Sequence, residues 1–300
     1  MSTKKRNRDT PDESGTEPEA MQHRELIDAV NTSGFPLEFA CADVIRRSSN
    51  WTVGLEQYSI QFGGEATCVD VVAERQVANG RKLLLLIEIK RALPEYKMWA
   101  FLPSIISAKD LNGRCFRVQK HPSMNPKRVS FCPCGFLDLS RGHLAARAVE
   151  LGRKRHQNGR PHANTNTIED ACHQVELGCL GLCDELVDTE DGGATQEWCI
   201  LPVIVTTADL RLGKFDATDV SAQDGRIDAD RVALDSVPYV YLSRSVRLRS
   251  LEHLPSGSYE RDRSLAARAQ NNRLHVLVVR FEYLPDLLRQ ALDFELKAPR

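Results

Sequence analysis

The chain has 300 residues, a formal net charge of −1, 42% hydrophobic residues and 27% charged residues. These values are those of an ordinary globular protein with one large domain or two smaller ones. A net charge near zero excludes a global field that attracts nucleic acid, so such attraction needs a local basic patch. The longest aliphatic run, residues 83–87, is too short for a membrane span.

The N-terminal segment is polar and helical structure is predicted to follow it. Residues 1–22 contain almost nothing apolar, so they predict a disordered tail that cannot offset its ordering entropy by burial. No apolar stretch follows the basic N-terminus, so no signal peptide is predicted and we expect a cytoplasmic protein without membrane contact. A short helix is predicted over residues 24–30.

A second helix is predicted to begin near Pro36, which suits a first helical turn. Glu38 lies at the border of its apolar stripe. The stripe recurs at helical spacing and consists of Leu37, Ala40, Cys41, Val44 and Ile45.

A strand-rich block follows, with strands predicted at residues 67–73 and 82–89 around an Asn79-Gly80 turn. Later elements are helices at 98–108 and 166–186, strands at 198–206, 234–242 and 275–281, and a closing amphipathic helix at 284–292. Pro202 is unusual for the central strand that the run 198–206 predicts. The element order predicts an α/β sandwich around a mixed central sheet, built as a single elaborated domain over residues 23–300.

A basic segment lies within this domain, at about residues 114–162. It holds eleven lysines and arginines against Asp138 and Glu150. So much positive charge favours contact with phosphates by an insertion, and a solvated loop is the alternative.

The nine cysteines are expected to be free thiols in a reducing cytoplasm, several of them packed as small hydrophobes. Cys179 and Cys183 lie one helical turn apart and should pack the core. Cys132-Pro-Cys134, together with His121 and His143, suggests zinc only as a minority interpretation, because the cysteine spacing differs from the usual two-residue gap.

Asp70, Glu88 and Lys90 lie on or directly after the predicted strands and are the candidate catalytic residues. Strand side chains alternate faces, so Glu88 and Lys90 point the same way at the end of a buried strand. Asp70 interrupts the apolar neighbour strand in the same manner. Two carboxylates can hold Mg²⁺ or Mn²⁺, and a nearby lysine can stabilise negative charge as a phosphodiester is hydrolysed.

This arrangement resembles the PD-(D/E)xK nuclease superfamily, which has the restriction-endonuclease-like α/β/α fold. The resemblance covers residues 34–91 and rests on Asp70, on Glu88-Ile89-Lys90, and on the preceding helix that contains Glu38. It implies that Asp70, Glu88 and the Ile89 carbonyl bind the metal, that Lys90 is the catalytic lysine and that Glu38 is an auxiliary acid. Val69 stands where the family usually has a proline.

The hairpin geometry sets a condition on this site. If Asn79-Gly80 were the centre of a strict two-residue turn, Asp70 would pair with Ile89 and point away from Glu88. A common site therefore requires a bulge or an odd-length loop between residues 73 and 83, and we predict one.

The sequence thus predicts a metal-dependent nuclease that cuts DNA in repair, restriction or mobile-element defence. One alternative is an inactive nuclease fold that binds DNA or a protein partner, and another is an RNA-processing nuclease. A homodimer is allowed by the resemblance, although the sequence shows no dimer surface. His173 and Gln174 are expected on a helix surface, with a contact to the cleft as the alternative.

Overall fold

The computed structural model describes residues 16–77, 81–93, 97–103, 114–120, 128–133, 143–152, 162–164, 166–188, 196–228, 230–245 and 273–290. Within these ranges the α-helices are α1 (Thr16–Ser33), α2 (Phe35–Arg47), α3 (Asn166–Asp188) and α6 (Leu284–Gln290), with short 3₁₀ helices η6 (Ala217–Asp219) and η7 (Phe281–Tyr283). No helix in the described part of the chain is long and apolar enough to cross a membrane.

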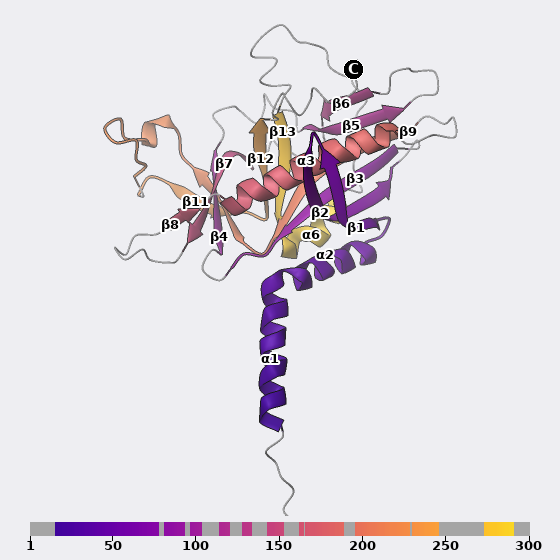
Figure 1. Cartoon of the computed structure of the whole chain (residues 1–300). Coiled ribbons are helices and arrows are strands. Elements are labelled where there is room, and N and C mark those ends of the chain that lie inside the picture. Colours follow the sequence, from indigo (N-terminus) through magenta and orange to yellow (C-terminus); the bar gives the residue numbers. More distant parts are fainter. Residues whose placement is uncertain are drawn as a thin grey trace, which may run out of the picture.

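The strands of the first half are β1 (Thr52–Phe62), β2 (Glu65–Gln76), β3 (Arg81–Lys90), β4 (Met98–Pro103), β5 (Arg114–Lys120), β6 (Arg128–Pro133) and β7 (Leu144–Gly152). Those of the second half are β8 (His162–Asn164), β9 (Gln196–Thr206), β10 (Asp209–Lys214), β11 (Ala233–Ser236), β12 (Tyr239–Ser245) and β13 (Arg273–Arg280). The protein is therefore of mixed α/β class, as predicted (Figure 1).

The described strands join into one 13-stranded mixed sheet with the order β1-β2-β3-β9-β13-β12-β7-β4-β10-β11. Strand β5 pairs with β6 and with β9, and β8 pairs with β7. Strand β3 runs antiparallel to β2 and parallel to β9, so it is central. Its apolar run is buried because helices cover both faces of the sheet here, which is why the run lacks polar alternation.

Helix α3 crosses one face of the sheet, and α2 and α6 pack together against the other (Figure 1). Alternate residues of β3 feed the two cores. Leu84 and Leu86 belong to the core under α3, whereas Leu85 and Ile87 belong to the core shared with α2 and α6. The predicted 166–186 helix and the apolar stripe of the second helix are confirmed as the elements that cover the sheet.

Strand β9 confirms the predicted central strand and shows how it tolerates Pro202. On one edge it pairs continuously with β3. On the other edge it pairs with β5 up to Ile200 and with β13 from Val203 onward. Pro202 lies between these two ladders, so its missing N–H removes no ladder hydrogen bond on that edge.

Helix α2 begins after a sharp change of chain direction at Gly34, whose φ of 91° lies in the left-handed region that favours glycine. Helix α1 projects away from the body of the protein (Figure 1). It begins at Thr16, earlier than the predicted start at residue 24, and so occupies part of the segment assigned to a disordered tail. Residues 1–15 lie outside the described residues.

Two predicted elements differ from the structure. The helix predicted over residues 98–108 is wrong at its start, where Met98–Pro103 forms β4 between β7 and β10; residues 104–108 are not described. Trp99 and Phe101 are buried on one face of β4, an alternation that appears only once the strand is paired, because the short apolar stretch fits a helix as well. The single strand predicted at 234–242 is two strands, β11 and β12, interrupted at Val237-Pro238.

The basic segment at 114–162 contributes to the sheet where it is described. Strands β5 and β6 form a ribbon beside β9, and β7 lies between β4 and β12. Residues 121–127, 134–142, 153–161 and 165 are not described, and most of the basic side chains of the segment fall there or are otherwise not placed. The expected phosphate contact therefore remains a prediction.

Candidate active site

The register of β2 and β3 places Asp70 and Glu88 on the same face of the sheet, as a shared site requires. Val71 pairs with Ile87 and Gln76 with Lys82, so continuation of the ladder places Asp70 opposite Glu88. The Val77 N–H donates to the Arg81 carbonyl at 2.7 Å, which closes a loop of odd length. The predicted odd-length loop is thus confirmed by the register, and regular pairing of Asp70 with Ile89 does not occur.

A second irregularity, which we did not predict, lies at Asp70 itself. Val69 and Val72 both pack in the core under α3, whereas Val71 packs in the opposite core. Residues three apart in a regular strand face opposite sides, so the alternation is interrupted here. Gln57 lies opposite Asp70 in β1 and has a φ of 51°, which marks the same distortion on the neighbouring strand.

The distortion places the Asp70 side chain where it accepts a hydrogen bond from the backbone of β3. The regular ladder between β2 and β3 ends at Val71 and Ile87, and the N–H of Ile89 donates to the Asp70 Oδ2 at 2.6 Å instead of to the β2 backbone. In a strand the N–H and C=O of one residue point toward the same neighbour. The Ile89 carbonyl therefore faces the side on which Asp70 lies.

Glu38 joins the site from α2 through a glutamine bridge. The Gln57 amide donates to Glu38 Oε2 at 2.7 Å and to Asp70 Oδ1 at 3.4 Å. The Gln57 carbonyl in turn accepts from the Cys68 thiol at 3.5 Å. Helix α2 and strands β1 and β2 thus place two carboxylates around one amide.

Glu88 and Lys90 form an ion pair at the end of β3. Lys90 Nζ lies 2.6 Å from Glu88 Oε1 and also donates to Gln174 Oε1 on α3 at 3.0 Å. Glu88 is 1% exposed, and its other oxygen, Oε2, is buried without a hydrogen-bond partner in the described part of the protein. A buried carboxylate oxygen with no donor is costly, and a bound cation would relieve that cost.

The pKa values of Glu38, Asp70 and Glu88 are all raised, because the three carboxyl groups are partly or wholly buried close together. Burial, followed by repulsion from Asp70, raises the pKa of Glu88 to about 7, against the attraction of Lys90. Burial also raises the pKa of Asp70, although the Ile89 N–H, Lys90 and Gln57 oppose the change. Burial and then Asp70 raise the pKa of Glu38. A cation at this place would relieve all three effects.

Two glycines of α3 allow the helix to come close to the site. A Cβ at Gly178 would lie 2.6 Å from Val69 Cγ2, and one at Gly181 would lie 1.9 Å from Ile60 Cγ2. Only glycine permits this close approach of α3 to β1, β2 and β3. The approach brings Gln174, one turn before Gly178, within hydrogen-bond distance of Lys90.

The donor set fits a hard divalent cation but is incomplete as a protein cage. Among the described residues, no three His, Cys, Asp or Glu side chains are grouped closely enough to hold a metal ion. Mg²⁺ commonly binds through one or two carboxylates and keeps several waters. Asp70, Glu88 and the Ile89 carbonyl would supply such a set, and the orphaned Glu88 Oε2 is the atom that most needs it.

All the residues singled out for the site in the sequence lie in one region, but two of its members were not assigned to it. Gln57 was not predicted at all, and Gln174 was expected on the helix surface with the cleft as the alternative. His173 instead pairs with Glu65. Cys134 and His121, two residues of the minority zinc interpretation, lie outside the described residues. As predicted, the seven cysteines whose side chains are described are not in disulfides, and Cys179 and Cys183 are fully buried.

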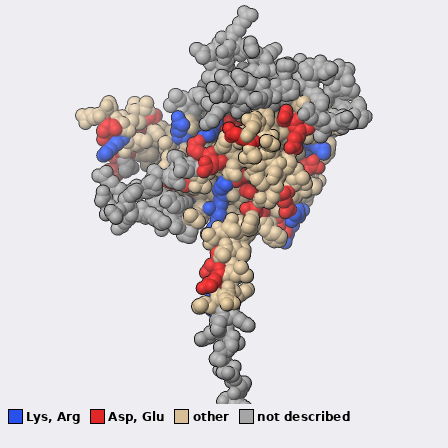
Figure 2. Space-filling model, in the orientation of Figure 1, with Lys and Arg blue, Asp and Glu red and all other residues tan. Residues whose placement is uncertain are grey.

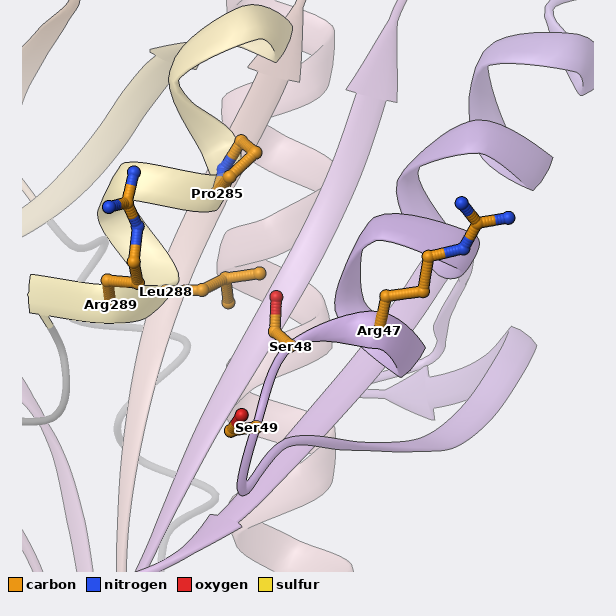
Figure 3. A pocket seen from close by; sticks show the side chains of 6 residues that line it. All are labelled: Arg47, Ser48, Ser49, Pro285, Leu288 and Arg289. Carbon is orange, nitrogen blue, oxygen red and sulfur yellow. The ribbon is translucent and has the colours of Figure 1, made fainter.

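A cavity of about 340 Å³ lies elsewhere, between the C-terminal turn of α2 and helix α6 (Figure 3). Its two arginines, Arg47 and Arg289, are already paired with Asp43 and Asp286 on their own helices. The end of α2 adds negative partial charge there, so the cavity is poorly suited to an anion. It is separate from the acidic site, where Glu38 occupies the first turn of α2.

No protein-family model, no curated protein and no solved structure matches this chain.

Proposed function

We propose that this chain is a nuclease of the restriction-endonuclease-like type that hydrolyses DNA phosphodiester bonds with Mg²⁺ or Mn²⁺. The observation that carries the proposal is the convergence of Asp70 and Glu88 beside Lys90, with Glu88 Oε2 buried and unpartnered. Helices on both faces of the sheet and the odd-length hairpin loop are consistent with this fold. Repair, restriction or mobile-element defence in the cytoplasm would be its setting.

The residues of the site have distinct roles in this proposal. Asp70, Glu88 and the Ile89 carbonyl would hold the metal, which would supply an activated water and neutralise charge on the scissile phosphate. Lys90 places a positive charge beside the reacting phosphate. Gln174 orients the Lys90 amine from α3, and Gln57 fixes Asp70 and Glu38 relative to each other.

One observation favours the alternative of an inactive nucleic-acid- or partner-binding module. The Lys90 amine is held in an ion pair with Glu88, and a lysine locked in such a pair contributes little to catalysis. Two facts support activity instead: the Lys90 side chain is 25% exposed, and the pair lies beside Asp70 rather than away from it.

On the face in Figure 2, acidic and basic side chains interleave over the described surface without a continuous basic area.

The test is cleavage of nucleic acids by the wild type and by Lys90→Ala, with Mg²⁺ or Mn²⁺. Loss of a single charge-stabilising donor should lower kcat by about 100-fold or more. Lys82→Ala is the matched control, since Lys82 lies on the same strand, pairs with Glu74 and is about 26 Å away at the rise of a strand. Linear duplex, branched and single-stranded DNA should be assayed beside RNA.

Cleavage that Lys90→Ala loses and Lys82→Ala keeps is the expected result. Equal cleavage by Lys90→Ala and the wild type would overturn the site. Cleavage of RNA alone would replace DNA by RNA as substrate. A folded wild type that binds nucleic acid and cleaves none would establish the inactive module.

A further inference from the structure

Two phenylalanine side chains are exposed to solvent at the start of α2. Phe35 is 62% exposed and Phe39 is 71% exposed. They are four residues apart on one helix, so their rings are neighbours on the same side of it. Helix α2 packs on the sheet through Cys41, Ala42 and Ile45, so neither ring is needed for the core. Adjacent exposed rings form an apolar patch, and contiguous apolar patches, unlike single apolar side chains, mark interaction sites.

The two rings lie at the start of α2, which also carries Glu38 of the acidic site. Glu38 directly precedes Phe39 and follows Phe35 within the same turn. Through Gln57, Glu38 is linked to Asp70 by two hydrogen bonds. A polymer strand whose phosphate lies at Asp70 and Glu88 and which continues past Glu38 would meet the part of α2 that carries the two rings.

We infer that Phe35 and Phe39 stack on unpaired bases of the substrate, so that the enzyme acts on nucleic acid with a single-stranded portion. The inference rests on the proposed nuclease function and specifies its substrate class. Each base inside a duplex is stacked on its neighbours and offers an aromatic side chain only its edge. A base in a single strand, a flap or a branch offers its face, and stacking on that face tolerates any sequence.

A protein partner is the competing occupant of an apolar surface, and the other exposed apolar side chains identify where it would bind. Met21, Leu26, Ile27 and Val30 lie on α1, beyond the change of direction at Gly34. Helix α1 projects from the body and carries acidic side chains on the face in Figure 2, which does not suit nucleic acid. Phe35 and Phe39 instead share the start of α2 with Glu38, so we assign them to the acidic site rather than to α1.

The experiment compares binding of two probes by the wild type and by the double variant Phe35→Ala/Phe39→Ala. The probes are a fluorescent oligothymidylate and a blunt duplex of equal length, in buffer with a chelator so that no cleavage occurs. Loss of the stacked bases should weaken oligothymidylate binding by at least about tenfold and leave duplex binding unchanged. Phe35→Tyr/Phe39→Tyr keeps both rings and should restore the wild-type affinity.

Leu234→Ala is the control, because Leu234 is 46% exposed on β11 at the opposite edge of the sheet and should change neither affinity. Equal weakening of both probes by the alanine variant, or no weakening of either, overturns the inference. So does a change in oligomeric state, measured by light scattering, that accompanies the loss of binding. This experiment measures binding and the Lys90→Ala experiment measures cleavage, so the two can fail independently. The protein can cleave nucleic acid without stacking on bases, and it can stack on bases without cleaving.

Discussion

Replacing Glu88 by glutamine is expected to stabilise the metal-free protein at alkaline pH and to abolish the proposed activity. Burial, followed by repulsion from Asp70, raises the pKa of this carboxyl from 4.5 to about 7 in the folded protein. A folded-state pKa above the unfolded value means that the contribution to stability is fully present below pH 4.5 and is lost as the pH rises through 7. Glutamine stays neutral, so Glu88→Gln should avoid that loss.

The magnitude follows from the two pKa values. One pKa unit corresponds to about 1.4 kcal/mol, so a rise from 4.5 to about 7 corresponds to about 3 kcal/mol of free energy of unfolding. Glu88 is 1% exposed, so solvent screens this effect little. Lys90 keeps Gln174 as an acceptor in the variant. For a domain of this size, the gain is worth roughly 6 °C or more in Tm.

The assay is thermal unfolding with a chelator at about pH 5 and about pH 8, where linkage predicts the largest contrast. The wild type should lose more stability than Glu88→Gln between the two pH values. Added Mg²⁺ at about ten times its Kd should restore roughly 1.4 kcal/mol to the wild type and nothing to the variant. Glu74→Gln is the control, since Glu74 is 39% exposed and paired with Lys82. Identical pH dependence in the wild type and Glu88→Gln would refute the reasoning.

Two further predictions concern α3. Gln174→Ala removes one of the two acceptors of the Lys90 amine, so kcat for DNA cleavage should fall about tenfold through poorer positioning, while KM and Tm stay the same; an unchanged kcat would remove Gln174 from the site. Gly181→Ala places a Cβ 1.9 Å from Ile60 Cγ2, and the overpacking should lower the free energy of unfolding in urea by about 1–2 kcal/mol after the gain in helix propensity. Gly54→Ala, whose Cβ finds its nearest atom at 3.5 Å, is the control, and equal stability of the two variants would contradict the close packing of α3.

The elements with a strong apolar period could be predicted from the sequence. Three such patterns each mark one buried surface and form where predicted: the apolar run of β3, the apolar stripe of α2 and the apolar face of α3. The failure at β4 has a physical reason. Its short stretch of apolar residues is compatible with both periods, and only its neighbours β7 and β10 decide that it pairs as a strand.

The sequence by itself determined that Asp70, Glu88 and Lys90 interrupt apolar strands, because hydrophobic patterning is local and can be read residue by residue. Whether the two carboxylates share a face was a matter of hairpin register, which depends on the length of a loop and not on the strands themselves. The tertiary structure also decided the contacts of Gln57 and Gln174, since these amides reach the site from β1 and α3. Polar residues carry no periodic signal of their partners, so their roles emerge only when distant elements pack together.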